Sequence, residues 1–198
     1  DGQRHSTAVG YLNPAKSRAN LHVETSAFAT RLLFDVKRCS GVAYAQNGKA
    51  VEVKARREVI LCGGAINSPQ LLLLSGIGNG EQLQSLDIPV VHHLPGVGQN
   101  LIDHLICLVG FVCNAPITLA NAGTSESLAA YAQSRMGLLT SNVAEAGGFV
   151  KVLPHSPVPD LQFHFAPSYF VNHGFDNPTG HGFSIGPTLV QPKSVGYL

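Results

Sequence analysis

The stretch that decides the fold is REVILCGGAINSPQLLLLSGIG, which spans residues 57–78. Residues 57–62 end in a run of apolar side chains, which predicts a strand that is buried on both faces. The pair Gly63-Gly64 follows that strand without an intervening polar loop. Ser68-Pro69 suits the start of a helix, with the serine as N-cap and the proline in the first turn. The sequence therefore predicts a strand–glycine–helix unit.

The predicted helix is expected to be buried, because Leu71–Leu74 makes it apolar on every side, and Gly76 is expected to close it as the C′ residue. Two glycines between a strand and a helix let the backbone approach a ligand with no Cβ in the way. The helix N-terminus then offers unpaired N–H groups, and α/β folds hold nucleotides at such strand ends. The alternative is a tight connection that binds nothing.

The flanking sequence predicts a β-meander before this unit and a mixture of helices and strands after it. Residues 20–35 are rich in strand formers and predict two short strands or one bent strand within a meander over residues 20–55. Asn47-Gly48 predicts a hairpin turn of type I′, which needs positive φ at both residues. The remaining predicted elements are helices at 79–86 and 124–136, and strands at 88–94, 105–113, 148–153, 160–165 and 183–190. The composition changes near residue 104, where we place a domain boundary.

Composition excludes several classes of protein. Hydrophobic residues make up 44% of the 198 residues and charged residues 13%, which is too apolar for a disordered chain. A net charge of +1 provides no basic excess for nucleic acid, so none is expected as a partner. The longest apolar run, Leu105–Cys113, is about half of a membrane-spanning helix, so no membrane span is expected.

Cysteine and histidine spacing predicts no metal site. The four cysteines form no CxxC pair, and the histidines show no close metal-binding spacing. Buried free thiols in a reducing compartment are the expected state of the cysteines. The chain opens at Asp1 without an initiator methionine and shows no targeting pattern. We therefore expect a piece of a longer protein and a cytoplasmic setting.

Catalytic motifs are incomplete in this chain. Gly76–Gly80 and Gly96–Gly98 resemble dinucleotide-binding fingerprints, but both lack the third glycine in the required place. No G-x-S-x-G nucleophile elbow is present in the sequence. The candidate acid–base residues are histidines, among them His164 on a predicted strand and His173 in a predicted loop. A structural, hydrogen-bonded histidine is the alternative interpretation of both.

Residues 64–78 match, at every defined position, the second signature of the glucose–methanol–choline (GMC) oxidoreductases, and the chain resembles that family. Further landmarks of the family follow in family order at residues 1–7, 20–23, 94–104, 159–165, 181–183 and 192–196. The resemblance covers nearly the whole chain and is strongest to the branch of choline and alcohol dehydrogenases.

The resemblance implies an FAD-dependent oxidoreductase that acts on the CH–OH group of donors. A base takes the hydroxyl proton of an alcohol or of choline, and flavin N5 takes the hydride, so an aldehyde forms. The implied fold class is α/β plus α+β. Residues 1–104 correspond to the later part of an FAD-binding, Rossmann-like domain that lacks its GxGxxG segment, and residues 105–198 to part of an antiparallel-sheet substrate domain. The implied partner is a small-molecule alcohol.

The resemblance also assigns roles to individual residues. Ala29 stands where family members contact adenine through the backbone, and Cys62, Gly63 and Gly64 are expected close to the ADP moiety of FAD. His173 resembles a histidine that some choline-oxidising members place beside the substrate. The catalytic histidine of the family lies outside the matched segments, so no catalytic residue is expected in this chain. The alternatives are a non-catalytic binding or interaction module, or a lyase, on the same scaffold.

Overall fold

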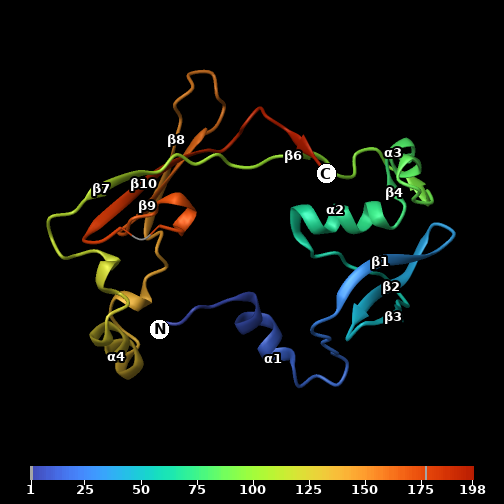
Figure 1. The fold of residues 1–198 in the computed structure, drawn as a ribbon, viewed down its shortest axis with the longest axis horizontal. Helices are drawn as coiled ribbons and strands as arrows, with labels where there is room; N and C mark the ends of the chain where they lie inside the picture. Colours follow the sequence, from blue (N-terminus) through green and yellow to red (C-terminus); the bar gives the residue numbers. More distant parts are fainter. Residues whose placement is uncertain (1, 177) are drawn as a thin grey trace. The chain divides into compact units, whose positions relative to one another are not determined.

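The computed structural model describes residues 2–176 and 178–198, and it divides the chain into two compact units (Figure 1). One unit comprises residues 17–102 together with 194–198, and we call it the meander unit. The other comprises the segment through Lys16 together with residues 103–193, and we call it the sheet unit. The expected assignment of residues 1–104 and 105–198 to an FAD domain and a substrate domain stays a prediction.

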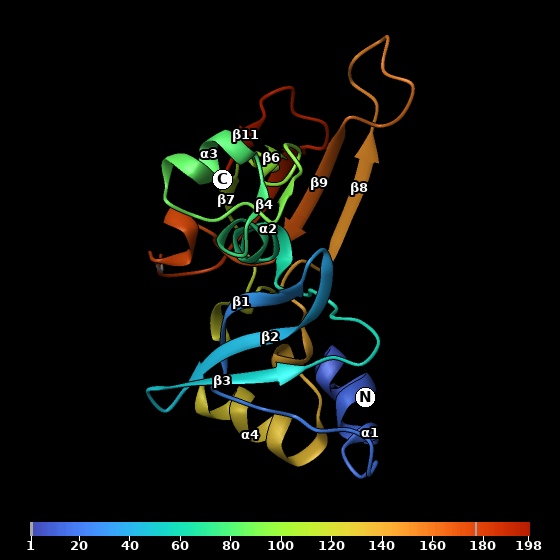
Figure 2. The same cartoon turned by 90° about the vertical axis from the view of Figure 1, so that its right-hand side faces the viewer.

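Three antiparallel strands form the β-meander, as predicted. They are β1 (Phe28–Asp35), β2 (Arg38–Gln46) and β3 (Lys49–Lys54), and β2 lies between the other two (Figure 2). Asn47 and Gly48 have φ values of 51° and 73°, so both central residues of the turn have the positive φ that type I′ requires. The first strand begins at Phe28, and residues 20–27 precede it without strand structure.

The prediction of a buried strand at residues 57–62 is wrong. This segment makes no strand pairing within the part of the chain that the structure describes. Ile60 is 74% exposed, and Cys62 is exposed as well. An apolar run becomes a strand only when a neighbouring strand takes up its backbone N–H and C=O groups, and none of the described strands lies in that position. Cys107 is also exposed, so the expectation of buried thiols fails for both cysteines.

The helix after the glycine pair forms, but it begins earlier than predicted. It is α2 (Gly64–Leu74), with Gly63 at the N-cap position and Pro69 inside the helix. Ser68 does not cap it, since its Oγ instead accepts a hydrogen bond from the Gly63 N–H at 3.0 Å. No residue of α2 is buried, so the expected all-round burial is also wrong. Gly76 follows the helix with φ +85°, as a C′ glycine should.

The rest of the meander unit consists of short elements. Asn79 Oδ1 caps α3 (Gly80–Ser85) by accepting from the Glu81 and Gln82 N–H groups, and the helix predicted at 79–86 is thereby confirmed. The strand predicted at 88–94 is shorter than expected. The short strands are β4 (Ile77–Gly78), which pairs in parallel with β5 (His92–His93), and β6 (Gln99–Leu101), which pairs antiparallel with β11 (Gly196–Tyr197).

A four-stranded antiparallel sheet forms the centre of the sheet unit. Its strands are, in spatial order, β7 (Val109–Val112), β10 (Gly182–Leu189), β9 (Leu161–Ala166) and β8 (Ala146–Val150). Thr124 caps α4 (Ser125–Ser134), and this confirms the helix predicted there. The shorter helical segments are Ala8–Leu12, α1 (Asn13–Ala15), Leu119–Asn121, Leu138–Thr140 and Asn172–Gly174. Helices and strands are thus mixed along the chain, as the expected fold class requires.

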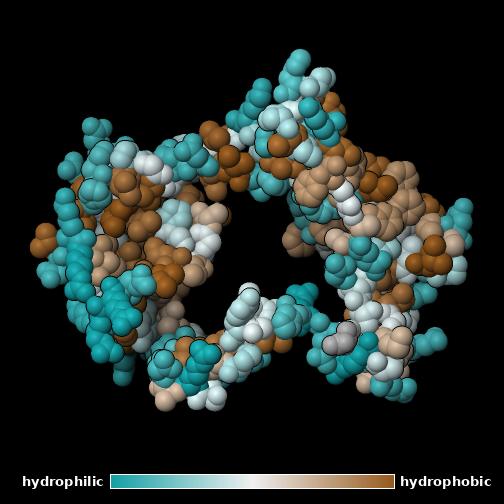
Figure 3. All heavy atoms as spheres, turned by 180° about the vertical axis from the view of Figure 1, so that it is seen from behind, coloured by the Kyte–Doolittle hydropathy of each residue, from teal (hydrophilic) through white to brown (hydrophobic). Residues whose placement is uncertain are grey.

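Few apolar side chains of the described residues are buried. The buried hydrophobic residues are Leu32, Leu33, Ala43 and Leu83. Hydrophobic atoms are visible on the surface of each unit in Figure 3. None of the helices in residues 2–176 and 178–198 combines the length and the apolar character needed to cross a membrane.

Asp160 holds the connection between β8 and β9. Its Oδ1 accepts from the Val152 N–H and its Oδ2 from the Leu153 N–H, each at 2.8 Å. The side chain is almost fully enclosed, with 4% of the residue exposed. The hydrogen bond from the Val152 N–H is the main cause that holds the pKa of the Asp160 carboxyl below its ordinary value, and the bond from the Leu153 N–H contributes less.

We predict that Asp160→Asn lowers the melting temperature at neutral pH, because the amide replaces one of the two charged acceptor oxygens with a donor. A pKa lowered by folding means that the carboxylate stabilises the protein above its unfolded pKa and stops doing so as the pH falls through the folded pKa. Between about pH 5 and pH 2 the wild type should therefore lose stability more steeply than the variant. Thermal melts across this pH range test the prediction, with the exposed Asp103→Asn as the control. Parallel pH profiles of wild type and Asp160→Asn would contradict it.

Candidate functional site

A candidate site in the meander unit is an open cavity of about 610 Å³ between β1, α2 and the extended segment before α2. Its lining residues are Ala27, Phe28, Ala29, Thr30, Val42, Val59, Ile60, Leu61, Cys62, Gly63, Asn67, Ser68, Gln70, Leu71 and Leu74. None of these side chains carries a charge at neutral pH. We call it the meander cavity.

One wall of the meander cavity is the start of β1, an edge strand. Only one edge of β1 is paired within the described sheet, and its partner is β2. The pairing register skips Thr30 between Ala29 and Arg31, which marks a bulge. Thr30 Oγ1 donates to the Ala43 carbonyl at 3.2 Å, which ties the bulged residue to β2. An edge strand keeps backbone N–H and C=O groups without a sheet partner, so this wall offers backbone hydrogen bonds to an occupant.

The opposite wall is built from α2 and the glycine turn that precedes it. Asn67, Gln70, Leu71 and Leu74 recur at helical spacing, and they present one face of α2 to the cavity. A Cβ at Gly63 would lie 3.1 Å from Asn67 Cβ and 3.2 Å from the Ser68 nitrogen. The turn is therefore tight, and only glycine fits it without a shift of the helix start.

Three of the four cofactor-binding residues expected from the sequence line this one cavity. Ala29 comes from β1, and Cys62 and Gly63 come from the segment before α2, a separation of more than thirty positions in the sequence. Gly64 is adjacent but is not part of the lining; its φ is +85°, and a Cβ there would meet nothing within 4 Å. Tertiary folding thus brings together residues from both ends of the expected site.

His173 lies in the sheet unit, within a tight turn rather than a cavity wall. Asn172, His173 and Gly174 have φ values of 46°, 55° and 84°, so three consecutive residues are left-handed. The Gly174 N–H donates to the Val171 carbonyl at 2.8 Å, and a bridge between Val171 and Asp176 closes the turn. A left-handed run with two non-glycine residues is strained, and such strain concentrates at functional sites.

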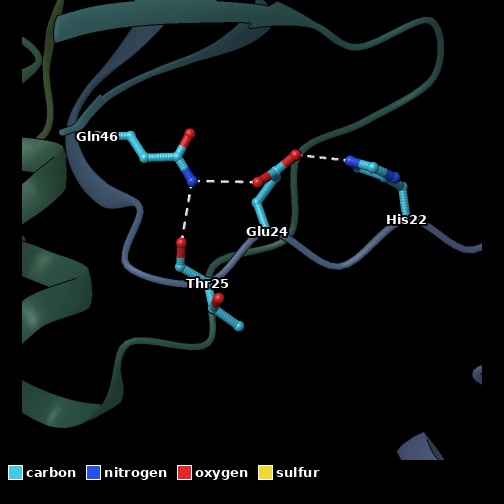
Figure 4. A network of polar contacts seen from close by, with 4 residues as sticks. All are labelled: His22, Glu24, Thr25 and Gln46. Carbon is cyan, nitrogen blue, oxygen red and sulfur yellow. Dashed lines mark hydrogen bonds and ion pairs between the residues drawn. The ribbon is translucent and has the colours of Figure 1, made fainter.

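A polar network at the start of β1 holds the segment that leads into the cavity wall (Figure 4). Gln46 Nε2 donates to Glu24 Oε2 at 3.1 Å and to the Thr25 carbonyl at 3.0 Å, and His22 Nε2 lies 2.6 Å from Glu24 Oε1. The hydrogen bond from the Gln46 side chain is the main cause that lowers the pKa of Glu24, and the hydrogen bond with His22 is the second. The network joins the segment before β1 to the end of β2.

Sequence reasoning missed the polar part of the cavity lining. Asn67 and Gln70 on α2 and Thr30 on β1 line the cavity and were not expected there. For the helix a signal exists in the sequence, since Asn67, Gln70 and Leu74 follow a three- and four-residue spacing. For Thr30 there is none, because the bulge that places it is a property of strand pairing.

The chemistry of the meander cavity favours a largely apolar, uncharged group with hydrogen-bonding edges. Its walls are apolar and neutral, with amide side chains at Asn67 and Gln70 and free backbone groups along β1. A bare charged group would find no opposite charge among the lining side chains. Within the described residues, no group of three or more histidine, cysteine or acidic side chains gathers in a way that could hold a metal ion.

Comparison with known proteins identifies relatives over the whole chain. The sequence profile of GMC oxidoreductase matches residues 1–106. An uncharacterized GMC-type oxidoreductase of Mycobacterium tuberculosis is 48% identical over 197 residues, which cover all of this chain and 37% of the relative. The mitochondrial choline dehydrogenase of Mus musculus is 44% identical over 201 residues, which cover all of this chain and 34% of the relative. The chain therefore spans about a third of the length of these curated relatives.

Solved structures share the fold at lower identity. One is a formate oxidase of Aspergillus oryzae, whose structure was determined to examine the effect of a mutation on FAD modification. It is 24% identical to this chain with a TM-score of 0.88, and the match covers 98% of this chain and 39% of that one. The pyridoxine 4-oxidase of Mesorbium loti is 22% identical with a TM-score of 0.77, over all of this chain and 36% of that one. The described fold is therefore one that these two solved oxidases also contain.

Proposed function

We propose that this chain, which belongs to the GMC oxidoreductase family, forms part of an FAD-dependent oxidoreductase. The proposed reaction is the oxidation of the CH–OH group of an alcohol or of choline. The observation that carries the proposal is the meander cavity. Ala29, Cys62 and Gly63, which the family resemblance assigns to FAD, line the same cavity although β1 and the glycine turn are distant in sequence. The relatives named choline dehydrogenase support the substrate class.

The lining residues fit the adenine end of FAD. Adenine is planar and has hydrogen-bonding edges, and the cavity combines apolar walls with the free backbone edge of β1 and two amide side chains. A backbone contact at Ala29 tolerates a small side chain, which matches the alanine found there. Gly63 keeps the approach to the helix start open because it has no Cβ. When bound, FAD supplies the hydride acceptor for oxidation of the alcohol carbon.

The residues of this chain would bind and orient, and the chemistry would belong to the cofactor and to residues elsewhere in the protein. We propose that the meander unit holds part of FAD and that the sheet unit forms part of the substrate domain. Within the sheet unit, His173 is the proposed substrate-contacting residue. Its strained turn presents an imidazole at a defined position, and a Cβ added at Gly174 would lie 3.4 Å from the Phe170 ring.

The proposal is tested on the protein at its full natural length. We expect the purified protein to show flavin absorbance and this absorbance to bleach when choline or a simple primary alcohol is added without oxygen. Bleaching by choline alone would identify the choline branch, and bleaching by primary alcohols would identify a broader alcohol dehydrogenase. A well-folded protein that stays colourless after reconstitution with FAD would refute the proposal.

A substitution that fills the meander cavity should expel the cofactor. Ala29→Trp places a large ring in the cavity, so we expect the FAD dissociation constant to rise at least about tenfold, the cost of modest overpacking. Ala50→Trp is the matched control, because Ala50 is exposed on β3 of the same sheet and does not line the cavity. Binding is measured by quenching of flavin fluorescence. Equal FAD affinity in the two variants would contradict a cofactor role for this cavity.

For His173 we predict a loss in turnover without a loss of FAD. Asparagine tolerates the left-handed backbone, so His173→Asn keeps the turn and removes the imidazole. We expect kcat/KM for the alcohol to fall about tenfold, as for the loss of one substrate hydrogen bond. His155→Asn, at an exposed turn of the same unit, is the control. Unchanged kcat/KM in His173→Asn would exclude a substrate contact.

A further inference from the structure

Ser75 makes a polar connection between the two elements that form opposite walls of the meander cavity. Its Oγ accepts a hydrogen bond from the Leu32 N–H of β1 at 2.8 Å and donates to the Leu71 carbonyl of α2 at 2.5 Å. Ser75 is 9% exposed and Leu32 is 7% exposed, so the bond to β1 is shielded from water. One hydroxyl thus uses its donor and its acceptor in two different elements.

Both partners of this hydroxyl need it. The Leu32 N–H lies on an edge strand, and Ser75 takes the place of a neighbouring strand at this position. The Leu71 carbonyl belongs to the last turn of α2, where the Ser75 N–H goes to the Leu72 carbonyl at 3.0 Å. The helix end therefore leaves the Leu71 carbonyl available, and the Ser75 hydroxyl satisfies it.

The position of Ser75 is fixed from the other side by Gly76. Gly76 has φ +85°, and a Cβ there would collide with the Pro89 carbonyl oxygen. The Val91 and His92 N–H groups donate to the Gly76 carbonyl at 2.8 and 3.1 Å. The chain after Ser75 is thus held by backbone hydrogen bonds to the segment that leads into β5.

We propose that Ser75 is a positioning residue that sets the spacing between β1 and α2, and thereby the affinity of the meander cavity for FAD. On the helix side, Leu71 and Leu74 line the cavity and lie within about one helical turn of Ser75. On the strand side, Phe28–Thr30 line the cavity at the start of β1, the strand that Ser75 anchors. Loss of the hydroxyl removes this polar link between the strand and the helix without changing the identity of any lining side chain. This inference rests on the proposed function.

A second serine in the chain provides a closely matched control. Ser184 in β10 is 2% exposed, accepts from the Phe170 N–H at 3.1 Å and donates to the Ser168 carbonyl at 2.9 Å. It makes the same two kinds of bond as Ser75, but it belongs to the sheet unit and lines no part of the meander cavity. Ser184→Ala and Ser75→Ala therefore remove equivalent interactions, and only the second adjoins the proposed FAD site.

The experiment compares FAD dissociation constants and melting temperatures of the apo forms for wild type, Ser75→Ala, Ser75→Thr and Ser184→Ala in the full-length protein. We expect both alanine variants to melt earlier, but FAD affinity to fall about tenfold only in Ser75→Ala. Ser75→Thr retains the hydroxyl and should recover most of the affinity. If Ser75→Ala does not accumulate as folded protein, Ser75→Cys, with its weaker donor and acceptor, should give an intermediate affinity.

Cys62 supplies a readout that does not depend on catalysis. Cys62 lines the cavity and is exposed, whereas Cys107 is exposed in the sheet unit. FAD should slow alkylation of Cys62 but not of Cys107, and Ser75→Ala should weaken that protection at a fixed FAD concentration. Equal FAD affinity and equal protection in Ser75→Ala and Ser184→Ala would overturn this inference alone. A wild type that binds no FAD would overturn the proposed function and this inference with it.

Discussion

The unpaired edge of β1 is the constraint on which the meander unit depends. Every edge strand leaves a row of backbone N–H and C=O groups that need partners or access to water. Near its middle β1 meets this requirement through the Ser75 hydroxyl, which binds the Leu32 N–H in a shielded position. Toward its start, Phe28, Ala29 and Thr30 of the same strand line an open cavity. One strand therefore anchors a helix at one place and contributes to a candidate binding surface at another.

Glycines bracket the helix that packs on this edge. Before α2, Gly63 allows the chain to pass close to Asn67 and Ser68, and after α2, Gly76 adopts a positive φ beside the Pro89 carbonyl. A Cβ at Gly76 would collide with the Pro89 carbonyl oxygen, and a Cβ at Gly63 would make the neighbouring helix start shift by a few tenths of an ångström. Gly76, which belongs to the family signature, and Gly63, which precedes it, thus help to hold α2 in one orientation against β1. The serine between Leu74 and Gly76 completes that arrangement.

The sheet unit is organised by the two different faces of its central strand. β10 alternates buried small residues with larger half-buried ones, and the Tyr169 ring occupies the space above Gly182. On the opposite face the rings of Phe111 and Phe183 stack at 5.0 Å between centroids, with Phe165 nearby at 5.7 Å from Phe183. A regular antiparallel sheet of this kind is a rigid base for loops, and the strained turn at His173 is one of them.

The sequence by itself determined the elements whose causes are local. The Asn47-Gly48 turn, the helices predicted at 79–86 and 124–136, and the C′ glycine at position 76 depend on neighbouring residues, so their signals are readable without a fold. The family resemblance likewise predicted that Ala29, Cys62, Gly63 and Gly64 belong to one site, and the first three line one cavity. It could not indicate that Gly64 lies beside the cavity while Asn67, Gln70 and Thr30 line it.

Only the tertiary structure decided the features that depend on distant partners. The apolar run at residues 57–62 is extended without strand pairing, because pairing needs a neighbouring strand that no local pattern specifies. The helix α2 begins before Ser68, and the Ser68 hydroxyl does not cap it because it accepts a hydrogen bond from the Gly63 N–H. The link from Ser75 to Leu32 joins residues 43 positions apart, and a hydrogen bond over that separation exists only once the strand and the helix have come together.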